Sequence, residues 1–412
     1  MPEFLKLLPP AAALQRFLQA LPVDLHTPSE RVKTQDALGR SLAEAVTAPS
    51  PLPPFRRSTV DGYAVRAEDT FGASASQPAY LRRIGEVQMG RAADLALRTG
   101  EAATVHTGGM IPDDADAVVM LEDTQSVAED EIEVLKAAAA GQNVLLAGED
   151  VKAGEVVIEA GSLLRAQEIG GLLALGVTEI KVASQPRVAI LSTGDEVVPP
   201  EAEPGAGQVR DVNSYTLSAL VERAGSIPVR YGIIPDQLEA LRAAARKAHA
   251  ESEMVLIAAG SSVSARDITA DVIAELGPPG VLVHGVALRP GKPTILALCG
   301  RVPVVGLPGN PVSAIVVAGL FVLPVLRRLL GLRGPAWPAT LTATLAANVA
   351  SVAGREDYLP VRLEMSPKGL LAQPVYGRSN LIFTLVRADG LVQIPAEATG
   401  LEKGERVEVR PF

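Results

Sequence analysis

The sequence contains little cysteine, histidine or aromatic residue, and each scarcity argues against a class of protein. Its 412 residues include one cysteine, Cys299, so the chain can form no internal disulfide and a reducing compartment is expected. The four histidines are scattered without the spacing of a zinc site. Aromatic residues make up 3% of the chain and the net charge is −9, which argues against a nucleic-acid partner, since such proteins carry basic surfaces and stacking platforms.

Long uncharged runs are also rare. Residues 302–326 form one, and it has the length of a membrane span of about 20 residues. Pro303, Pro308, Pro311 and Pro324 interrupt it, so we expect a strand, a loop and a buried helix, and no membrane contact. The N-terminal Met-Pro-Glu-Phe lacks the basic start and apolar core of a signal peptide, and a cytoplasmic protein is therefore expected.

Composition and periodicity divide the chain into several units, as expected for a length that exceeds one ordinary core. Residues 3–47 carry leucines near helical spacing, and the next ten residues contain four prolines typical of a linker. We expect a helical and extended N-terminal subdomain (1–47 with 141–182), a β-rich inserted subdomain (48–140), an α/β domain (183–332) and a small C-terminal β-barrel-like domain (333–412).

Strand and helix patterns alternate between residues 187 and 330, which predicts a three-layer α/β domain with a parallel sheet. Strands are expected near 187–191, 229–233, 254–259, 281–287, 294–298 and 302–306, and helices near 212–224, 236–250, 267–276 and 311–330. Ligands of such sheets bind at the carboxyl ends of the strands. Polar loops at 192–196, 260–267 and 307–313 each follow a strand, so we expect a site there.

Two loops near the end of this domain are suited to an anion. Arg-Pro-Gly-Lys-Pro (289–293) offers two cations on a bent backbone, although its spacing does not match a Walker motif. Leu-Pro-Gly-Asn-Pro-Val-Ser (307–313) places Asn310 as the expected N-cap, and Pro311 in the first turn, of an apolar helix. Free N–H groups at a helix start favour negative charge, so the predicted ligand is a phosphate or a similar oxyanion.

Several acidic positions have both a structural and a functional interpretation. Glu196 lies in an acidic turn, Asp236 begins an Asp-x-x-Glu capping-box pattern, and Asp267 suits the first turn of a helix. The carboxylates at this sheet edge can alternatively converge on one magnesium ion, which prefers oxygen ligands. Asp61 and Thr107 stand in segments rich in turn residues, and taken alone these segments favour two ordinary β-turns.

Six motifs occur in order along nearly the whole chain. They are Ser-Thr-Val-Asp-Gly-Tyr-Ala (58–64), Thr-Gly-Gly-Met-Ile-Pro-Asp-Asp-Ala-Asp-Ala-Val-Val-Met (107–120), Ala-Gly-Glu-Asp-Val (147–151), Pro-Arg-Val-Ala-Ile-Leu-Ser-Thr-Gly-Asp-Glu (186–196), Arg-Pro-Gly-Lys-Pro (289–293) and Leu-Pro-Gly-Asn-Pro-Val-Ser (307–313). Together they resemble the molybdopterin molybdenumtransferase family, known as MoeA in bacteria and as the E-domain of gephyrin.

The resemblance implies an enzyme that transfers molybdenum from molybdate into adenylated molybdopterin and releases AMP, with Mg²⁺ as cofactor. It also implies a MoaB/Mog-like molybdopterin-binding fold for the α/β domain and a homodimer with a shared active cleft. Transient contacts with a molybdopterin adenylyltransferase and with apo-molybdoenzymes are expected on the same basis.

The family's functional residues carry over to matching positions of this chain. By resemblance, Asp61 and Thr107 would complete the cleft from the second subunit. The catalytic set would further contain Glu196, Asp236, Asp267 and Lys292, of which the three carboxylates would hold the metal. The substrates would contact Ser192, Gly194, Arg289, Lys292, Pro308, Gly309, Asn310, Ser313 and Arg355.

The chain departs from the family pattern at three places. Residues 258–264 read Ala-Ala-Gly-Ser-Ser-Val-Ser where the family usually has Ser-Gly-Gly-Val-Ser-Val-Gly, which leaves the roles of Ser262 and Ser264 open. Arg289 stands where lysine is common, which keeps the charge and changes the geometry. The glycine-rich stretch near the C-terminus is altered as well, so no role is assigned to Ser379 or Thr384.

Two other functions remain as alternatives. A molybdopterin adenylyltransferase would resemble the α/β domain alone, and the additional domains that carry Asp61 and Arg355 argue against it. A non-catalytic scaffold of the gephyrin type would not need the acidic residues or Lys292, which this chain keeps.

Overall fold

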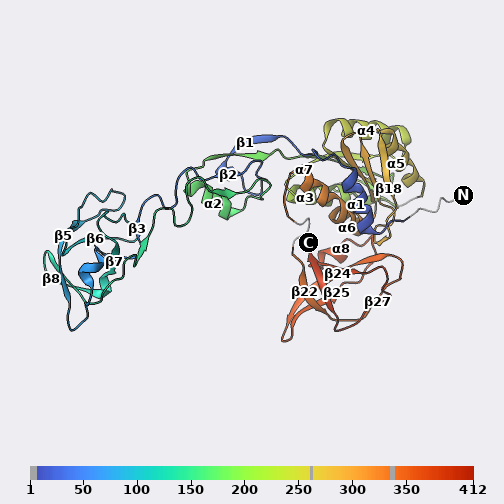
Figure 1. Ribbon diagram of the computed structural model, residues 1–412. Helices are drawn as coiled ribbons and strands as arrows, with labels where there is room; N and C mark the ends of the chain where they lie inside the picture. The colour runs from blue at the N-terminus through green and yellow to red at the C-terminus, as the bar shows by residue number, and fades with distance from the viewer. Residues whose placement is uncertain (1–6, 260–262, 335–338) are drawn as a thin grey trace.

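The computed structural model describes residues 7–259, 263–334 and 339–412, and of residues 263–267 it describes the backbone alone. The molecule is elongated, with a β-rich region at one end and an α/β region beside a β-barrel at the other (Figure 1). The chain runs out to the β-rich region and back, and three short antiparallel strand pairs join the two directions. These pairs are β1 (Ser29–Lys33) with β12 (Glu179–Ala183), β2 (Val46–Thr47) with β11 (Val156–Ile158), and β3 (Arg57–Ser58) with β10 (Val144–Leu145).

The N-terminal stretch corrects the first expectation. Helix α1 (Pro10–Ala20) is present, but the helical interpretation of residues 3–47 is wrong beyond it, and residues 3–6 lie outside the described part. Pro22 and Pro28 cannot continue a helix, and the following residues form η1 (Thr34–Asp36) between paired strands. Helix α1 buries Ala13 and Phe17 in the core of the α/β region, while α2 (Ala166–Ala174) lies in the second part, 141–182, of the expected N-terminal subdomain.

A six-stranded sheet builds the β-rich end in the order β7-β4-β6-β5-β9-β8. Its strands are β4 (Gly62–Val65), β5 (Ala79–Glu86), β6 (Glu101–Val105), β7 (Ala117–Met120), β8 (Thr124–Ala128) and β9 (Glu131–Val134), with η2 (Ala67–Thr70) and η3 (Leu121–Asp123) between them. Alternate residues of β4 face opposite ways: Val65 packs in one apolar cluster and Ala64 in another. Strand β4 is therefore buried on both of its faces, and the turns at its ends are attached to a packed core.

The α/β sheet has six strands in the order β16-β13-β17-β21-β20-β18. They are β13 (Arg187–Thr193), β16 (Ile227–Ile234), β17 (Met254–Ala259), β18 (Pro279–His284), β20 (Ile295–Cys299) and β21 (Val302–Pro308); β14 (Val197–Val198) and β15 (Val209–Arg210) pair beside it. The helices are α3 (Asn213–Arg223), α4 (Leu238–Glu251), α5 (Val263–Glu275), α6 (Pro311–Val317) and α7 (Leu323–Leu329), with the π turn η4 (Ala318–Val322) joining the last two.

Strand direction differs from the expected all-parallel sheet in one respect. Strand β20 runs antiparallel to both of its neighbours, β21 and β18. Because β20 and β21 form a hairpin, the loop that enters β20 and the loop that leaves β21 meet at the same edge of the sheet. That edge also holds the carboxyl ends of the parallel strands, so the hairpin is what brings the two predicted anion loops together.

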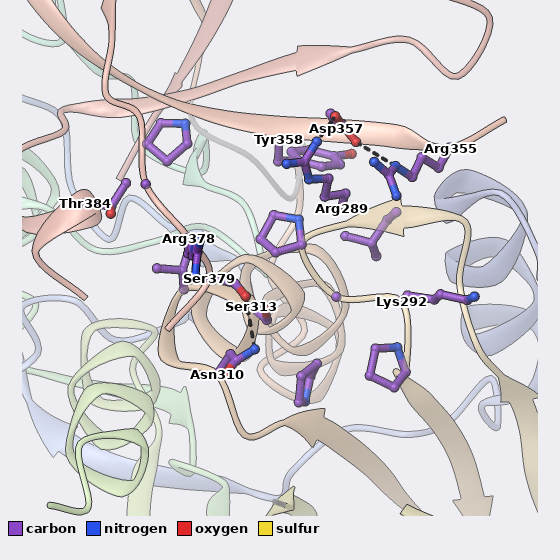
Figure 2. A pocket seen from close by; sticks show the side chains of 18 of the residues that line it. Arg289, Lys292, Asn310, Ser313, Arg355, Asp357, Tyr358, Arg378, Ser379 and Thr384 are labelled. Atoms are coloured by element: carbon purple, nitrogen blue, oxygen red, sulfur yellow. Dashed lines mark hydrogen bonds and ion pairs between the residues drawn. The ribbon is translucent and has the colours of Figure 1, made fainter. Parts of the chain in front are cut away.

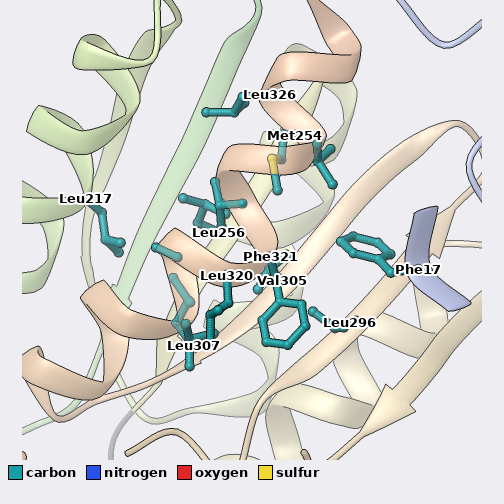
Figure 3. Packing of buried hydrophobic residues seen from close by; sticks show 14 of the residues in the cluster. Phe17, Leu217, Met254, Leu256, Leu296, Val305, Leu307, Leu320, Phe321 and Leu326 are labelled. Atoms are coloured by element: carbon teal, nitrogen blue, oxygen red, sulfur yellow. The ribbon is translucent and has the colours of Figure 1, made fainter. Parts of the chain in front are cut away.

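Both faces of this sheet are covered, as a three-layer domain requires. Val188 and Ile190 of β13 pack with α1, α3 and the 311–329 helical stretch, while Ala189 and Leu191 pack with α4 and α5. Figure 3 shows Phe321 and Leu320 of the helical stretch lying against strand residues such as Val305. Pro311–Leu329 is the one helical stretch in the described ranges apolar and long enough to span a membrane, and 72% of its most apolar window is buried inside the protein.

The C-terminal unit is a closed five-stranded barrel. Strands β24 (Glu356–Ser366), β25 (Gly369–Pro374), β22 (Leu341–Leu345), β28 (Arg406–Pro411) and β26 (Gly390–Ile394) follow one another, and β26 pairs back onto β24. The same unit also contains the strand pair β23 (Val349–Ala350) with β27 (Gly400–Leu401) and the short helix α8 (Phe383–Val386). Strand β19 (Leu288–Arg289) leaves the α/β region and pairs with β24, which fastens the barrel to the sheet edge. The expected C-terminal domain starts at residue 333, and its residues 335–338 lie outside the described part of the chain.

Candidate functional site

A cavity of about 660 Å³, here called the seam cavity, lies between the α/β sheet edge and the barrel. Three stretches line most of it: residues 288–295, residues 306–313 and parts of the barrel from 349 to 394. The predicted residues that it brings together are Arg289, Lys292, Pro308, Gly309, Asn310, Ser313 and Arg355. The cavity is thus built at the place where the β20–β21 hairpin puts both anion loops (Figure 2).

Gly291 determines the backbone conformation of the first anion loop, residues 289–293. Gly291 has a φ of 130°, and a Cβ added to it would lie 2.6 Å from Cγ2 of Val317. The buried hydroxyl of Thr294 donates a 2.6 Å hydrogen bond to the Gly291 carbonyl, which fixes the turn from within. Arg289 and Lys292 therefore leave a backbone that cannot relax easily, as the sequence pattern suggested.

A buried carboxylate that the sequence analysis missed organises the two arginines. Asp357 is 7% exposed, and it lies 3.4 Å from Nη1 of Arg289 and 3.3 Å from Nε of Arg355. The hydroxyl of Ser351 donates to Oδ2 of Asp357 at 2.8 Å and holds the carboxylate in place. Backbone pairing of Arg289 with Asp357 across β19 and β24 explains why the groups meet. Figure 2 shows the two arginines on either side of this carboxylate, with Lys292 extending away from it.

The second loop is tied to the barrel. Asn310 occupies the N-cap position of α6 and Pro311 its first turn, as predicted, but the Asn310 side chain makes no capping hydrogen bond. Its Nδ2 instead donates to Oγ of Ser379 at 3.0 Å, and the backbone N–H of Val312 donates to the Ser379 carbonyl. The amide of Asn213 on α3 also donates to the Gly309 carbonyl at 2.7 Å. The loop is therefore fixed from both sides, while Ser313 lines the cavity from the first turn of α6.

Ser379 and Thr384, to which the sequence assigned no role, both line the seam cavity, as does Arg378. They lie in the segment between β25 and α8 and on α8 itself. A cation on an irregular segment follows no periodic pattern in the sequence, so only the fold shows that Arg378 lines the same cavity as Arg289 and Arg355. The described residues thus give this cavity four cationic side chains: Arg289, Lys292, Arg355 and Arg378.

A second cluster, here called the acidic edge, lies at the ends of β13 and β16. Burial, followed by the charges of Asp195 and Glu196, raises the pKa of Asp236 above its usual value. The backbone N–H of Asp236 donates to Oδ1 of Asp195 at 3.1 Å. The capping-box interpretation of Asp236 is wrong, because α4 begins at Leu238 with no side-chain cap. A buried carboxyl beside two further carboxylates offers the oxygen ligands that a hard cation prefers.

The glycine and the serine that precede this edge each have a local structural role. At Gly194, with φ 144°, a Cβ would lie 2.6 Å from Oε2 of Glu196, so the glycine makes room for that carboxylate. Ser192 is buried, and its hydroxyl donates to Oδ1 of Asp211 at 3.3 Å, the same oxygen that accepts from the Ser214 N–H at the start of α3. Neither residue lines the seam cavity.

The third predicted carboxylate cannot be placed beside the other two. Helix α5 begins at Val263, so Asp267 falls in its second turn rather than in its first, and its side chain lies outside the described residues. The loop 260–262 with Ser262, and the side chain of Ser264, lie outside them too. Within the part of the chain whose side chains are described, no three His, Cys, Asp or Glu residues are gathered in a metal-binding arrangement.

Asp61 and Thr107 meet in a cluster at the β-rich end, here called the distal turn. Oδ1 of Asp61 accepts the backbone N–H of Thr107 at 2.9 Å and lies 3.6 Å from Nδ1 of His106. Nε2 of His106 is 2.8 Å from Oε1 of Glu86. Within one chain, the β-rich end and the seam cavity are at opposite ends of the molecule (Figure 1), so a single chain does not bring these two parts of the predicted site together.

Known families match nearly the whole chain. The MoeA N-terminal region (domains I and II) matches residues 8–176, a probable molybdopterin binding domain matches 189–328, and the MoeA C-terminal region (domain IV) matches 342–412. A putative molybdopterin biosynthesis protein of Methanocaldococcus jannaschii is 36% identical over 92% of this chain and 91% of its own length. The molybdopterin molybdenumtransferase of a Nostoc species is 34% identical over 94% and 89%, respectively.

Solved structures agree with these matches. The molybdopterin biosynthesis MoeA protein of Pyrococcus horikoshii OT3 has a TM-score of 0.85 at 33% identity, covering 99% of this chain and all of that one. Another crystal structure of a MoeA protein from this Pyrococcus species has a TM-score of 0.82 at 39% identity, with 98% and 99% covered. The expected multidomain α/β and β fold class, with its small C-terminal barrel, is confirmed.

Proposed function

The chain belongs to the MoeA family, and we propose that it is a molybdenum insertase that transfers molybdenum from molybdate into adenylated molybdopterin and releases AMP. The observation that carries this proposal is the seam cavity. Its two loops and the barrel gather Arg289, Lys292 and Arg355 around one space, and molybdate is a tetrahedral dianion that such a set of cations attracts. Neither alternative function accounts for a cationic site completed by the barrel.

The cavity supplies positioning rather than a nucleophile. Asp357 orients Arg289 and Arg355 before a ligand arrives, so the oxyanion meets donors that are already in place. Ser313 and Asn310 add neutral donors at the α6 end of the cavity. A cavity of about 660 Å³ exceeds what molybdate needs and leaves room for part of the adenylated molybdopterin. Holding both substrates in contact is the way in which such a site accelerates a displacement.

The acidic edge is assigned to the divalent metal and to the adenylated end of the substrate. Glu196, Asp236 and Asp267 would hold Mg²⁺, whose charge would offset that of the adenylate phosphates. The raised pKa of Asp236 supports this assignment, since it reflects burial and, after burial, the charges of the neighbouring Asp195 and Glu196. Bound metal would relieve that repulsion.

The test is AMP release from purified adenylated molybdopterin in the presence of Mg²⁺, with and without molybdate. Molybdate-dependent AMP release is expected, and Lys292→Met should reduce it, whereas Lys368→Met, in an exposed turn of the barrel, should not. An equal rate of AMP release with and without molybdate would contradict the proposed insertase activity. Attachment of AMP to molybdopterin from ATP would favour an adenylyltransferase, and inertness in both assays would favour a scaffold.

We further propose a cytoplasmic homodimer in which the distal turn of one subunit completes the seam cavity of the other. The separation of Asp61 from Lys292 within one chain supports this, because a single chain leaves the two parts of the proposed site apart. Contacts with an adenylyltransferase and with apo-molybdoenzymes would then be transient and would serve substrate delivery and product transfer.

Subunit complementation tests the shared cleft. Asp61→Asn and Lys292→Met homodimers should each be nearly inactive. A heterodimer purified with two different tags should regain about half of the wild-type kcat, because one of its two clefts combines Asp61 from one chain with Lys292 from the other. A heterodimer as inactive as its parents would show that each cleft is built from one chain.

A further inference from the structure

The distal turn contains a histidine that neither the motif nor the proposed function uses. His106 lies between two carboxylates: its Nε2 is 2.8 Å from Oε1 of Glu86, and its Nδ1 is 3.6 Å from Oδ1 of Asp61. That Asp61 oxygen also accepts the Thr107 N–H at 2.9 Å. Both contacts use Oδ1, which leaves Oδ2 for a ligand that approaches the turn.

The surroundings favour the charged form of the ring. The hydrogen bond to Glu86, and then the charges of Glu86 and Asp61, raise the pKa of His106 above its usual value. Glu86 comes from β5 and Asp61 from the turn before β4, and in the described part of the chain these are the charged groups that act on the ring. A protonated imidazole donates from both nitrogens and can hold both carboxylates, whereas a neutral ring donates from only one.

The backbone around His106 is fixed independently of its side chain. The His106 carbonyl accepts the N–H of Gly109 at 2.8 Å, and the Ser58 carbonyl accepts the N–H of Gly108 at 2.8 Å. Exposed ion pairs contribute little to folding, with a median of about 0–1 kcal/mol. His106, Glu86 and Asp61 are all substantially exposed, so the contacts orient Asp61 without being needed for the fold.

We infer that His106, in its protonated form, is a positioning residue that holds Asp61 in the orientation required by the shared cleft. The inference rests on the proposed function, because the role of Asp61 in the cleft belongs to it. Glu86 has two effects on the His106 ring: it favours the protonated form, and its hydrogen bond to Nε2 orients the ring so that Nδ1 faces Asp61. Activity should therefore fall as His106 loses its proton.

The first test is the pH dependence of AMP release. Wild-type kcat should decline on the alkaline side, and Glu86→Gln should move that decline to lower pH because the main cause of the raised pKa is gone. His106→Gln should lower kcat about ten- to a hundredfold and remove the alkaline decline, since a misplaced catalytic group can cost that much. KM for molybdate should stay unchanged, because the Arg289 loop is untouched. His26→Gln, a change at an exposed histidine elsewhere, serves as control.

A second test does not depend on turnover. The chain has four histidines, so the His106 signal in a proton NMR titration is the one that His106→Gln removes. Asp61→Asn should lower the measured pKa of His106, because it deletes one of the charges that raise it. An unmoved pKa, or a His106→Gln enzyme with wild-type kcat and pH profile, would overturn the inference. Absence of molybdate-dependent AMP release from the wild type would instead refute the proposed function.

Discussion

Replacing Gly291 with alanine tests whether the first anion loop depends on its close backbone approach. Its φ of 130° is a conformation that alanine adopts only with strain, which costs about 1–3 kcal/mol. The new Cβ would also lie 2.6 Å from Val317 Cγ2 and 3.0 Å from Leu288 Cδ1, and overpacking of this kind costs about 1–3 kcal/mol. The free energy of unfolding should therefore fall by about 2–6 kcal/mol in total.

Gly300, in the turn at the other end of the same hairpin, provides the matched control. Its φ is 60°, but a Cβ there would meet nothing within 4 Å, so alanine should cost only about 1–2 kcal/mol. Urea unfolding measures both losses, and AMP release measures KM for molybdate. Gly291→Ala should raise KM, because Arg289 and Lys292 shift with the loop, whereas Gly300→Ala should leave it unchanged. Equal stability losses, or an unchanged KM for Gly291→Ala, would refute the reasoning.

Three further predictions concern other parts of the molecule. Phe321→Ala should destabilise the α/β core by about 3–5 kcal/mol in urea unfolding, whereas Phe383→Ala, at an exposed position, should change stability by less than about 0.5 kcal/mol. Hydrogen bonding to Arg165 lowers the pKa of Glu168 to about 2, so its stabilisation, present above the usual carboxyl pKa of about 4.3, should fade as pH falls towards 2 and should be missing in Glu168→Gln. The pKa of Asp236 is raised, so its ionised form opposes folding above that pKa; Asp236→Asn should raise Tm at neutral pH without Mg²⁺ and weaken the rise in Tm that Mg²⁺ produces.

Periodicity predicted the α/β region well because its elements are long and buried. Strands such as β17 and helices such as α4 lie within a few residues of their expected positions. The reversed direction of β20 was not predictable, since an antiparallel strand and a parallel strand buried on both faces have the same apolar pattern. That single reversal decides that the loops at Arg289 and Asn310 meet at one edge.

The sequence predicted the positions of the anion loops better than it predicted the side-chain hydrogen bonds of residues that favour an N-cap. Asn310 and Asp236 both have residue types that favour an N-cap, yet tertiary partners use them differently: Ser379 binds the Asn310 amide, and neighbouring carboxylates surround Asp236. Asp357 was missed for the opposite reason. Nothing in the letters Arg-Glu-Asp distinguishes a buried organiser from a surface charge, and only the pairing of β19 with β24 places it between two arginines.

Turn chemistry alone gave no reason to connect the β-rich end with the anion loops. Asp61 and Thr107 form the local contact expected of turn residues, and their distance from the seam cavity within one chain hides any common role. The order of motifs along the chain supplied the link, and the shared cleft stays a prediction until complementation tests it.

The central claim is that the seam cavity binds molybdate, and anomalous scattering at the molybdenum absorption edge tests it most directly. Crystals of the protein soaked in molybdate should show a molybdenum peak within hydrogen-bonding reach of Arg289, Lys292 and Arg355, and Arg355→Met should weaken it. A molybdenum peak outside the seam cavity, or a peak in the cavity that is equally strong in Arg355→Met, would contradict the account.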